Sequence, residues 1–139
     1  MMKRTRVFWV WAIAIASATF LAGACESGGD GPSGPSGPGQ LTVSVSTTGA
    51  GGAAFLLTVT GAGITNPVAA NSGHLLYSNI SGNTLRVAVI GSHTSGALLR
   101  FRVPDLAQAS TYNATLNEVA GSDNNLQSTG NYTVTIPPP

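Results

Sequence analysis

Alternation of apolar and polar residues is the feature of this 139-residue chain that most restricts its fold. From Leu41 onward, several segments place apolar side chains at every second position, with mainly Thr, Ser, Asn or Arg between them: 41–45, 55–59, 85–89, 99–103, 112–116 and 132–136. A period of two places the apolar residues on one face of a β-strand. No stretch after Gln40 repeats convincingly at 3.6 residues. The sequence therefore predicts an all-β domain.

Turn-forming residues separate these segments, at 49–52, 61–63, 66–67, 81–83, 92–96 and 121–125. Ser81-Gly82-Asn83, between two apolar segments, predicts a tight hairpin. The prolines Pro137 to Pro139 cannot donate ladder hydrogen bonds and should end the last strand. Roughly seven to nine short strands, each with one apolar face, need a second sheet to cover that face. We therefore predict a single small β-sandwich, jelly-roll or immunoglobulin-like, over residues 41–139.

The first 24 residues have the three parts of a secretory signal peptide. A basic cluster of Lys3, Arg4 and Arg6 precedes the apolar run 7–21, and the small residues 22–24 follow it. The cations stay on the cytoplasmic side while the apolar run enters the bilayer as a helix. We expect residues 1–24 to direct secretion.

Cys25 follows this signal directly and is the only cysteine in the chain. The segment Leu21-Ala22-Gly23-Ala24-Cys25 resembles the lipobox of bacterial lipoproteins, with Leu21 one place further from the cysteine than in the usual pattern. Ala22-Gly23-Ala24 also suits ordinary signal peptidase, and an uncleaved anchor is a third reading, near the lower length limit for spanning. A lone cysteine in a secreted protein needs an explanation, which lipidation supplies. We expect lipidated Cys25 to hold the chain in the cell envelope, facing the periplasm or the exterior.

The segment from Glu26 to Gln40 reads ESGGDGPSGPSGPGQ. It contains no residue able to anchor a core; glycine and serine keep such a segment mobile, and proline keeps it extended. Residues 25–40 are therefore expected to be a lipidated cysteine followed by a disordered spacer.

Charged residues make up only 8% of the chain, against about 25% in ordinary soluble proteins. The signal contains Lys3, Arg4 and Arg6, so the remainder is mildly acidic. Nucleic-acid binding needs clustered Lys and Arg. This composition argues against a nucleic-acid partner.

Three later segments resemble the second half of a cohesin-like domain: SNISGNTLRVAVIG, SGALLRFRVPD and STYNATLNEVAGSDNNLQSTGNYTVTI. They match a glycine-centred hairpin, a G-x-L-x-x-F-x-V strand, and a long final pair ending in a short apolar strand. AAFLLTVTG is similar to an earlier amphipathic strand of that family. The resemblance covers about residues 41–136 and implies the jelly-roll-like sandwich shared by cohesins and carbohydrate-binding modules. The dockerin partner of cohesins is not carried over to this chain.

Candidate catalytic and metal-binding groups are sparse. His74 and His93 are the only histidines. A hydrolase would need a nucleophile, His93 and a carboxylate to converge, and nothing near His93 in the sequence supports this beyond serines that are abundant throughout. Two histidines without spaced cysteines or carboxylates make a poor metal site. The sequence Asp123-Asn124-Asn125, with Asp105, offers oxygens to calcium, but an Asx-type turn explains it more simply. We expect no enzyme activity, cofactor or metal.

The candidate binding residues are three tyrosines and one histidine: Tyr77, Tyr112, Tyr132 and His93. The tyrosines could form a sugar-stacking platform, although strand tyrosines usually bury the ring. We predict a membrane-anchored, non-catalytic module that binds a protein or glycan through a sheet face or through the loops 93–97 and 121–130. The alternatives are a structural envelope component without a discrete ligand and, less favoured, an unrecognised hydrolase.

Overall fold

The computed structural model describes residues 34–139; the predicted signal peptide, Cys25 and most of the predicted spacer lie outside them. In the described part, nine strands and two short 3₁₀ helices follow one another. Their bounds are β1 Gly39–Thr47, β2 Gly52–Thr60, β3 Thr65–Ala69, β4 Leu75–Ser81, β5 Thr84–His93, β6 Ser95–Val103, η1 Leu106–Thr111, β7 Asn113–Ala120, β8 Leu126–Gln127, η2 Thr129–Asn131 and β9 Tyr132–Thr135. Residues 34–139 form a compact unit.

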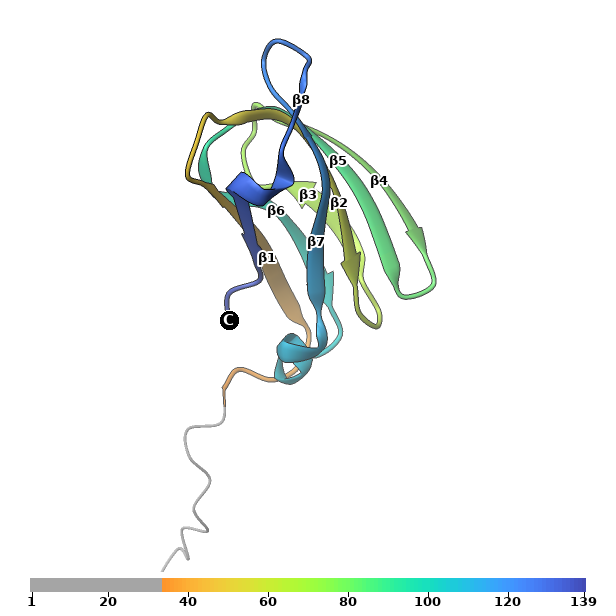
Figure 1. Ribbon diagram of the computed structural model, residues 1–139. Coiled ribbons are helices and arrows are strands. Elements are labelled where there is room, and N and C mark those ends of the chain that lie inside the picture. The colour runs from red at the N-terminus through yellow and green to blue at the C-terminus, as the bar shows by residue number, and fades with distance from the viewer. Residues whose placement is uncertain (1–33) are drawn as a thin grey trace, which may run out of the picture. The chain divides into compact units, whose positions relative to one another are not determined.

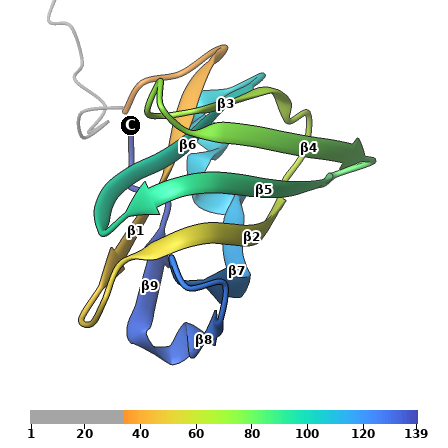
Figure 2. The same ribbon diagram turned by 90° about the horizontal axis from the view of Figure 1, so that it is seen from above.

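The strands form two antiparallel sheets that face each other, which confirms the predicted β-sandwich (Figures 1 and 2). One sheet has four strands in the order β3-β6-β1-β9, and the other has five in the order β4-β5-β2-β7-β8. The chain changes sheet several times, and the shortest of these connections joins β5 to β6 at a corner that consists of Thr94 alone.

The core lies between the sheets and is built by the predicted alternation. Alternate residues of β1, β2 and β5 point inward. β6 alternates from Leu99 to Val103, and Leu98 is also buried where the pairing with β1 shifts register. The fully buried side chains of largest volume come from these four strands: Phe55, Phe101, Leu41, Leu57, Leu85, Leu98, Leu99, Val43, Val45, Val59, Val87 and Val89. One continuous apolar core therefore holds both sheets together.

The predicted hairpin is present, with Gly82 and Asn83 between β4 and β5. Gly82 has φ +56°, which glycine adopts without steric cost. Gly61, directly after β2, has a different role, because a Cβ there would clash with the Tyr112 ring. Glycine at position 61 lets the chain pass directly over that ring.

The structure differs from the sequence-based prediction at three places. Asn66-Pro67, expected as a break between strands, lies inside β3, where the pairing with β6 shifts register. Proline is tolerated there because β3 is an edge strand and needs no ladder donor on its free side. His93, expected in a loop, is the last residue of β5. β1 begins at Gly39 rather than at Leu41.

A contact that involves Gly37 fastens the segment before β1 to η1. The Gly37 N–H donates to Asp105 Oδ1 at 2.8 Å, and the Leu106 N–H donates to the Gly37 carbonyl at 2.7 Å. Asp105 Oδ1 also accepts from the Ala107 N–H at 3.0 Å and so caps η1. No helix in the described part of the chain is long and apolar enough to span a membrane.

Candidate binding surface

The three tyrosines do not share a surface. Tyr112 and Tyr132 are buried, and their hydroxyl groups donate hydrogen bonds to the backbone carbonyls of Ala62 and Ala50, respectively. Only Tyr77 is open to solvent, with 61% of its surface exposed. A three-ring stacking platform is therefore not formed, because two of the rings complete the core.

The two histidines lie together, and their partners are structural. Their rings meet edge to face with centroids 5.7 Å apart, and His93, only 8% exposed, also packs against Phe55. Nε2 of His93 lies 3.2 Å from the Gly96 carbonyl oxygen, and Nε2 of His74 lies 3.1 Å from that of Ser92. Carbonyls only accept, so each ring carries a proton on Nε2. Within the described part of the chain, neither ring is paired with a serine hydroxyl or a carboxylate, as a catalytic triad would require.

The oxygens considered for calcium lie at different ends of the molecule. Asp105 caps η1, whereas Asp123 lies in the turn between β7 and β8 (Figure 1). Asp123 accepts hydrogen bonds from the Asn125 side chain at 2.8 Å and from its backbone N–H at 3.2 Å, and these bonds lower the Asp123 pKa. This is the Asx turn expected from the sequence. In residues 34–139, no group of three His, Cys, Asp or Glu side chains is placed to hold a metal.

The outer face of the five-stranded sheet is apolar. It carries five of the large hydrophobic side chains that the described residues expose to solvent: Leu56, Leu75, Tyr77, Ile90 and Leu126. Leu126 and Leu75 are 74% and 58% exposed, respectively. A contiguous apolar patch on a protein surface commonly marks an interaction site.

Strand register makes these side chains one continuous surface, called here the apolar face. One row crosses all five strands in the order Leu75, Ile90, Ala54, Ala120 and Leu126. Paired residues of neighbouring strands lie close enough for their side chains to touch. The row therefore forms an unbroken apolar band.

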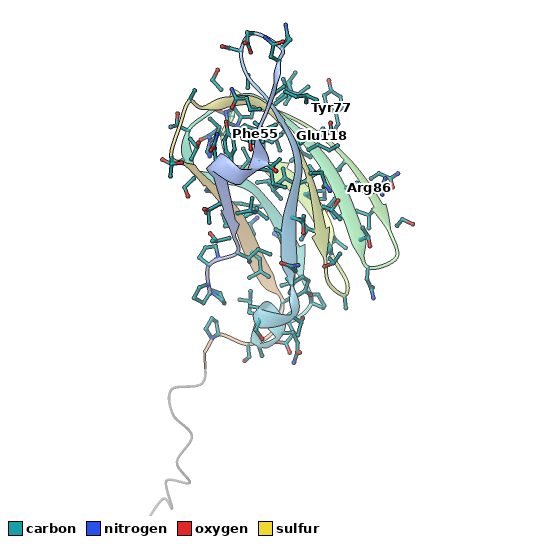
Figure 3. The ribbon with its side chains drawn as sticks, in the orientation of Figure 1. Phe55, Tyr77, Arg86 and Glu118 are labelled. Carbon is teal, nitrogen blue, oxygen red and sulfur yellow. The ribbon has the colours of Figure 1, made fainter. Side chains whose placement is uncertain are left out.

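A second row lies beside the first and runs through Tyr77, Ala88, Leu56 and Glu118. Arg86 lies on β5 at the next outward-facing position after Ala88, where it pairs with Thr58 of β2. Figure 3 shows Tyr77, Arg86 and Glu118 on the outer side of this sheet, and Phe55 on the inner side. The apolar face thus has a cation and a carboxylate at its margin.

The hollows on the apolar face are shallow. They have volumes of about 170, 190 and 270 Å³, and all three border Leu56. Pockets for drug-sized ligands typically measure roughly 300–1,000 Å³ and enclose the ligand. The surface is better suited to a broad partner than to an enclosed small molecule.

The outer face of the four-stranded sheet is polar by contrast. Its outward positions are mainly hydroxyl, amide and guanidinium groups, with Val68 on the edge strand β3: Gln40, Thr42, Ser44, Ser46, Arg100, Arg102, Thr133 and Thr135. The two outer faces of one sandwich therefore differ in kind. This asymmetry distinguishes the apolar face from ordinary scattered surface hydrophobics.

The apolar face was not predicted from sequence, although a signal for it is present. Several strands contain consecutive apolar residues, such as Phe55-Leu56-Leu57, Leu75-Leu76-Tyr77 and Val89-Ile90. In a two-layer sandwich only every second residue can reach the core. The extra apolar residues in these runs must point outward.

No protein-family model matches this sequence, and no curated protein matches it. A similar solved structure is a non-cellulosomal cohesin from the hyperthermophilic archaeon Archaeoglobus fulgidus, with a TM-score of 0.53 and 16% sequence identity. The match covers 68% of this chain and 75% of the cohesin chain. The fold is cohesin-like. The resemblance seen in the sequence is therefore confirmed for the architecture, and at this identity it concerns the fold alone.

Proposed function

We propose that this chain is a non-catalytic, extracytoplasmic binding module that holds a protein partner through the apolar face, while Cys25 anchors it to a membrane. The observation that carries the proposal is the contrast between the two outer sheet faces, one apolar and one polar. A sandwich needs no outward Leu or Ile for its own stability. Exposed aliphatic side chains on one face serve a function outside the fold.

The chemistry of the apolar face favours a protein over a glycan. Leu56, Leu75, Ile90 and Leu126 are aliphatic, and Tyr77 is the single exposed aromatic ring among them. Sugar recognition relies on aromatic rings that stack against the pyranose face, whereas aliphatic side chains match apolar protein surfaces. The partner should therefore present an aliphatic row of its own.

The two charged residues at the margin of the apolar face would set the orientation of the partner. Arg86 and Glu118 are both exposed and lie on opposite sides of Leu56, on β5 and β7. A partner with a carboxylate opposite Arg86 and a cation opposite Glu118 would dock in one direction only. Because exposed pairs contribute little free energy, binding should weaken only modestly with salt.

To test this, Ile90 is replaced by a photo-crosslinking amino acid, and crosslinking is carried out in the cells that naturally produce the protein. The matched probe replaces Thr133, which is exposed on the opposite outer face. We expect a discrete protein adduct from the Ile90 probe and none from the Thr133 probe. Adding Leu56→Glu should reduce the adduct at least about tenfold, because it buries a charge in the interface. Thr133→Glu should leave the adduct unchanged.

Two outcomes would overturn the proposal. Equal adducts from both faces, or an adduct insensitive to Leu56→Glu, would show that the apolar face is not the docking surface. Glycan binding by residues 32–139 that is lost in Tyr77→Ala but retained in Leu56→Glu would replace the protein partner by a sugar.

The membrane anchor is tested separately. The lone cysteine at the end of the predicted signal supports lipidation, and a Gly/Pro/Ser spacer gives the tethered sandwich reach. The chain should partition into the detergent phase of a phase-separating extraction, and Cys25→Ser should move it to the aqueous phase. If both forms remain in the aqueous phase, the lipid anchor is wrong.

A further inference from the structure

β4 ends the five-stranded sheet, and among residues 34–139 it pairs only with β5, so one side of its backbone has no partner strand in this part of the chain (Figure 1). The turn Gly82-Asn83 identifies which backbone groups these are. A two-residue turn closes with a hydrogen bond between its flanking residues, here Ser81 and Thr84. Hydrogen-bonded pairs then recur at every second residue of the hairpin. The backbone N–H and C=O groups of Leu76, Ser78 and Ile80 therefore point away from β5.

The other sheet edges carry features that discourage pairing, and β4 carries none. β3 contains Pro67 and a register shift, and β9 is followed within two residues by Pro137. β8 is only two residues long, and the part of β7 that extends beyond it contains Glu118 and a register shift against β2. β4 reads LLYSNIS over seven residues, without a charge, a proline or a register shift against β5. Charged residues, prolines and bulges are the usual protection of an edge. An unprotected edge of this length is a template for another strand.

Ile80 is a second sign that β4 has a missing neighbour. It lies on the side of β4 that faces the opposing sheet, together with Leu76 and Ser78, yet it remains 42% exposed. Leu76, on the same side, is packed against the core. An apolar side chain on the inner side of a sandwich is exposed only where nothing covers it.

We propose that two copies of this chain pair through their β4 strands, antiparallel, about a two-fold axis at Ser78. In this register Ser78 faces Ser78 of the second copy, and Leu76 faces Ile80 in both directions. The free groups of Leu76, Ser78 and Ile80 then form a complete set of ladder hydrogen bonds. Each exposed Ile80 gains an apolar neighbour, and residues 71–85 contain no Asp, Glu, Lys or Arg to repel the other copy.

The pairing leaves the apolar face open and enlarges it. A two-fold axis perpendicular to the sheet keeps both outer faces on the same side, in one continuous ten-stranded sheet built from two five-stranded ones. Tyr77 of each copy becomes a diagonal neighbour of the other, a spacing that aromatic side chains can bridge. The dimer would present two apolar faces side by side.

The first test measures the molar mass of residues 32–139 by light scattering over a range of concentrations. We expect a dimer that dissociates on dilution. Ser78→Pro removes one outward N–H without touching the β5 ladder, and proline is tolerated on edge strands; this variant should be monomeric with an unchanged circular-dichroism spectrum. Ser78→Lys places like charges opposite each other and should also be monomeric. Ser78→Ala keeps the N–H and should stay dimeric.

The second test determines the register in which the two β4 strands pair. Residues 32–139 contain no cysteine, because Cys25 is the only one in the chain. Ser78→Cys should form a disulfide-linked dimer on mild oxidation. Leu75→Cys, on the same strand, should not, because the two thiols would be six residues, about 20 Å, apart along the pair.

Three results would overturn the dimer: a monomer at every concentration, a dimer that survives Ser78→Pro and Ser78→Lys, or equal crosslinking of Leu75→Cys and Ser78→Cys. Leu56→Glu, which should abolish partner binding, should leave the dimer intact. Failure of one proposal is therefore distinguishable from failure of the other.

Discussion

Aromatic side chains bridge the two sheets at separate places in the core. Phe101 of β6 packs against Tyr112, with ring centroids 5.9 Å apart, and Phe55 of β2 meets Tyr132 of β9 edge-on at 6.0 Å. Tyr112 directly precedes β7 of the five-stranded sheet, and Tyr132 begins β9 of the four-stranded sheet, so each contact joins the two sheets. Aromatic rings bury large areas, so these few residues contribute strongly to stability.

Phe101→Ala should lower the free energy of unfolding by about 3–5 kcal/mol, because it removes a fully buried ring and leaves a cavity. The measurement is denaturant unfolding of residues 32–139. Tyr77→Ala, on the exposed face, is the control and should change stability by less than about 0.5 kcal/mol. Similar losses in the two variants would contradict the placement of the core.

Tyr112 makes stability depend on alkaline pH. Burial, with a smaller contribution from the negative charge of Asp105, raises the pKa of Tyr112 above its ordinary value of 10.0. The folded protein therefore keeps this proton where the unfolded chain releases it, so the free energy of unfolding should fall as the pH rises above about 10.

Tyr112→Phe removes this group and should flatten the alkaline pH dependence. At neutral pH the variant should lose about 0.5–1.5 kcal/mol, since the hydroxyl no longer donates to the Ala62 carbonyl. Denaturation of both proteins between about pH 7 and about pH 11 checks both expectations. Identical slopes above pH 10 would show that Tyr112 titrates as it does in the unfolded chain.

At the level of elements, the first strand is held from outside the sheets. η1 is only six residues long, and its cap Asp105 also binds the Gly37 N–H. The Leu106 N–H returns a bond to the Gly37 carbonyl, and Leu106 packs against the core beside Gly39. These contacts fasten the entry of β1 to the connection between β6 and β7.

A chain that begins at Pro38 lacks both Gly37 hydrogen bonds and keeps all of β1. It should be less stable than residues 32–139 by about 1–3 kcal/mol, the sum of two ordinary bonds. Thermal and denaturant unfolding of the two proteins measures the difference. A chain that begins at Ser36 keeps the bonds and should match the longer one; equal stability of all three would mean that the contact contributes nothing.

The sequence predicted the strands well, because an inward-facing residue at every second position is a local property of the chain. It predicted the edges poorly. In a sequence, Asn66-Pro67 indicates a turn. Only the pairing of β3 with β6 shows that Pro67 lies in a strand, at a register shift where proline is tolerated. His93 read as a loop residue because Ser92 and Gly96 surround it. Its burial depends on Phe55, which lies far away in the chain.

The candidate surface escaped prediction for a related reason. Leu75 and Leu126 are the two ends of one apolar row only because five strands align in register. Nothing in their local sequence relates one to the other. Tyr112 and Tyr132, by contrast, resemble binding residues in the sequence and prove to be core residues that hydrogen-bond to backbone carbonyls.

At the level of the whole molecule, both sheets share one core, so neither can hold its fold without the other. Small domains of this kind usually unfold in a single step. Residues 32–139 should give a β-type circular-dichroism spectrum, and its thermal transition should coincide with that of tyrosine fluorescence. A longer chain that starts at Glu26 should unfold at the same midpoint. A helical spectrum, or two separate transitions, would contradict the shared core.

The position of β1 between β6 and β9 has a consequence for how the chain acquires its structure. Leu41 pairs with Phe101 of β6, and Val45 pairs with Val134 of β9, so the first strand finds both of its neighbours in the second half of the domain. When such a chain emerges from a ribosome or a translocation channel, the backbone groups of β1 remain unpaired until β6 has emerged, and those that face β9 remain unpaired until the end of the domain. Pairings between distant segments also form slowly. During that interval the apolar alternation that builds the sandwich is exposed, and a cell that makes this protein has to keep it from aggregating.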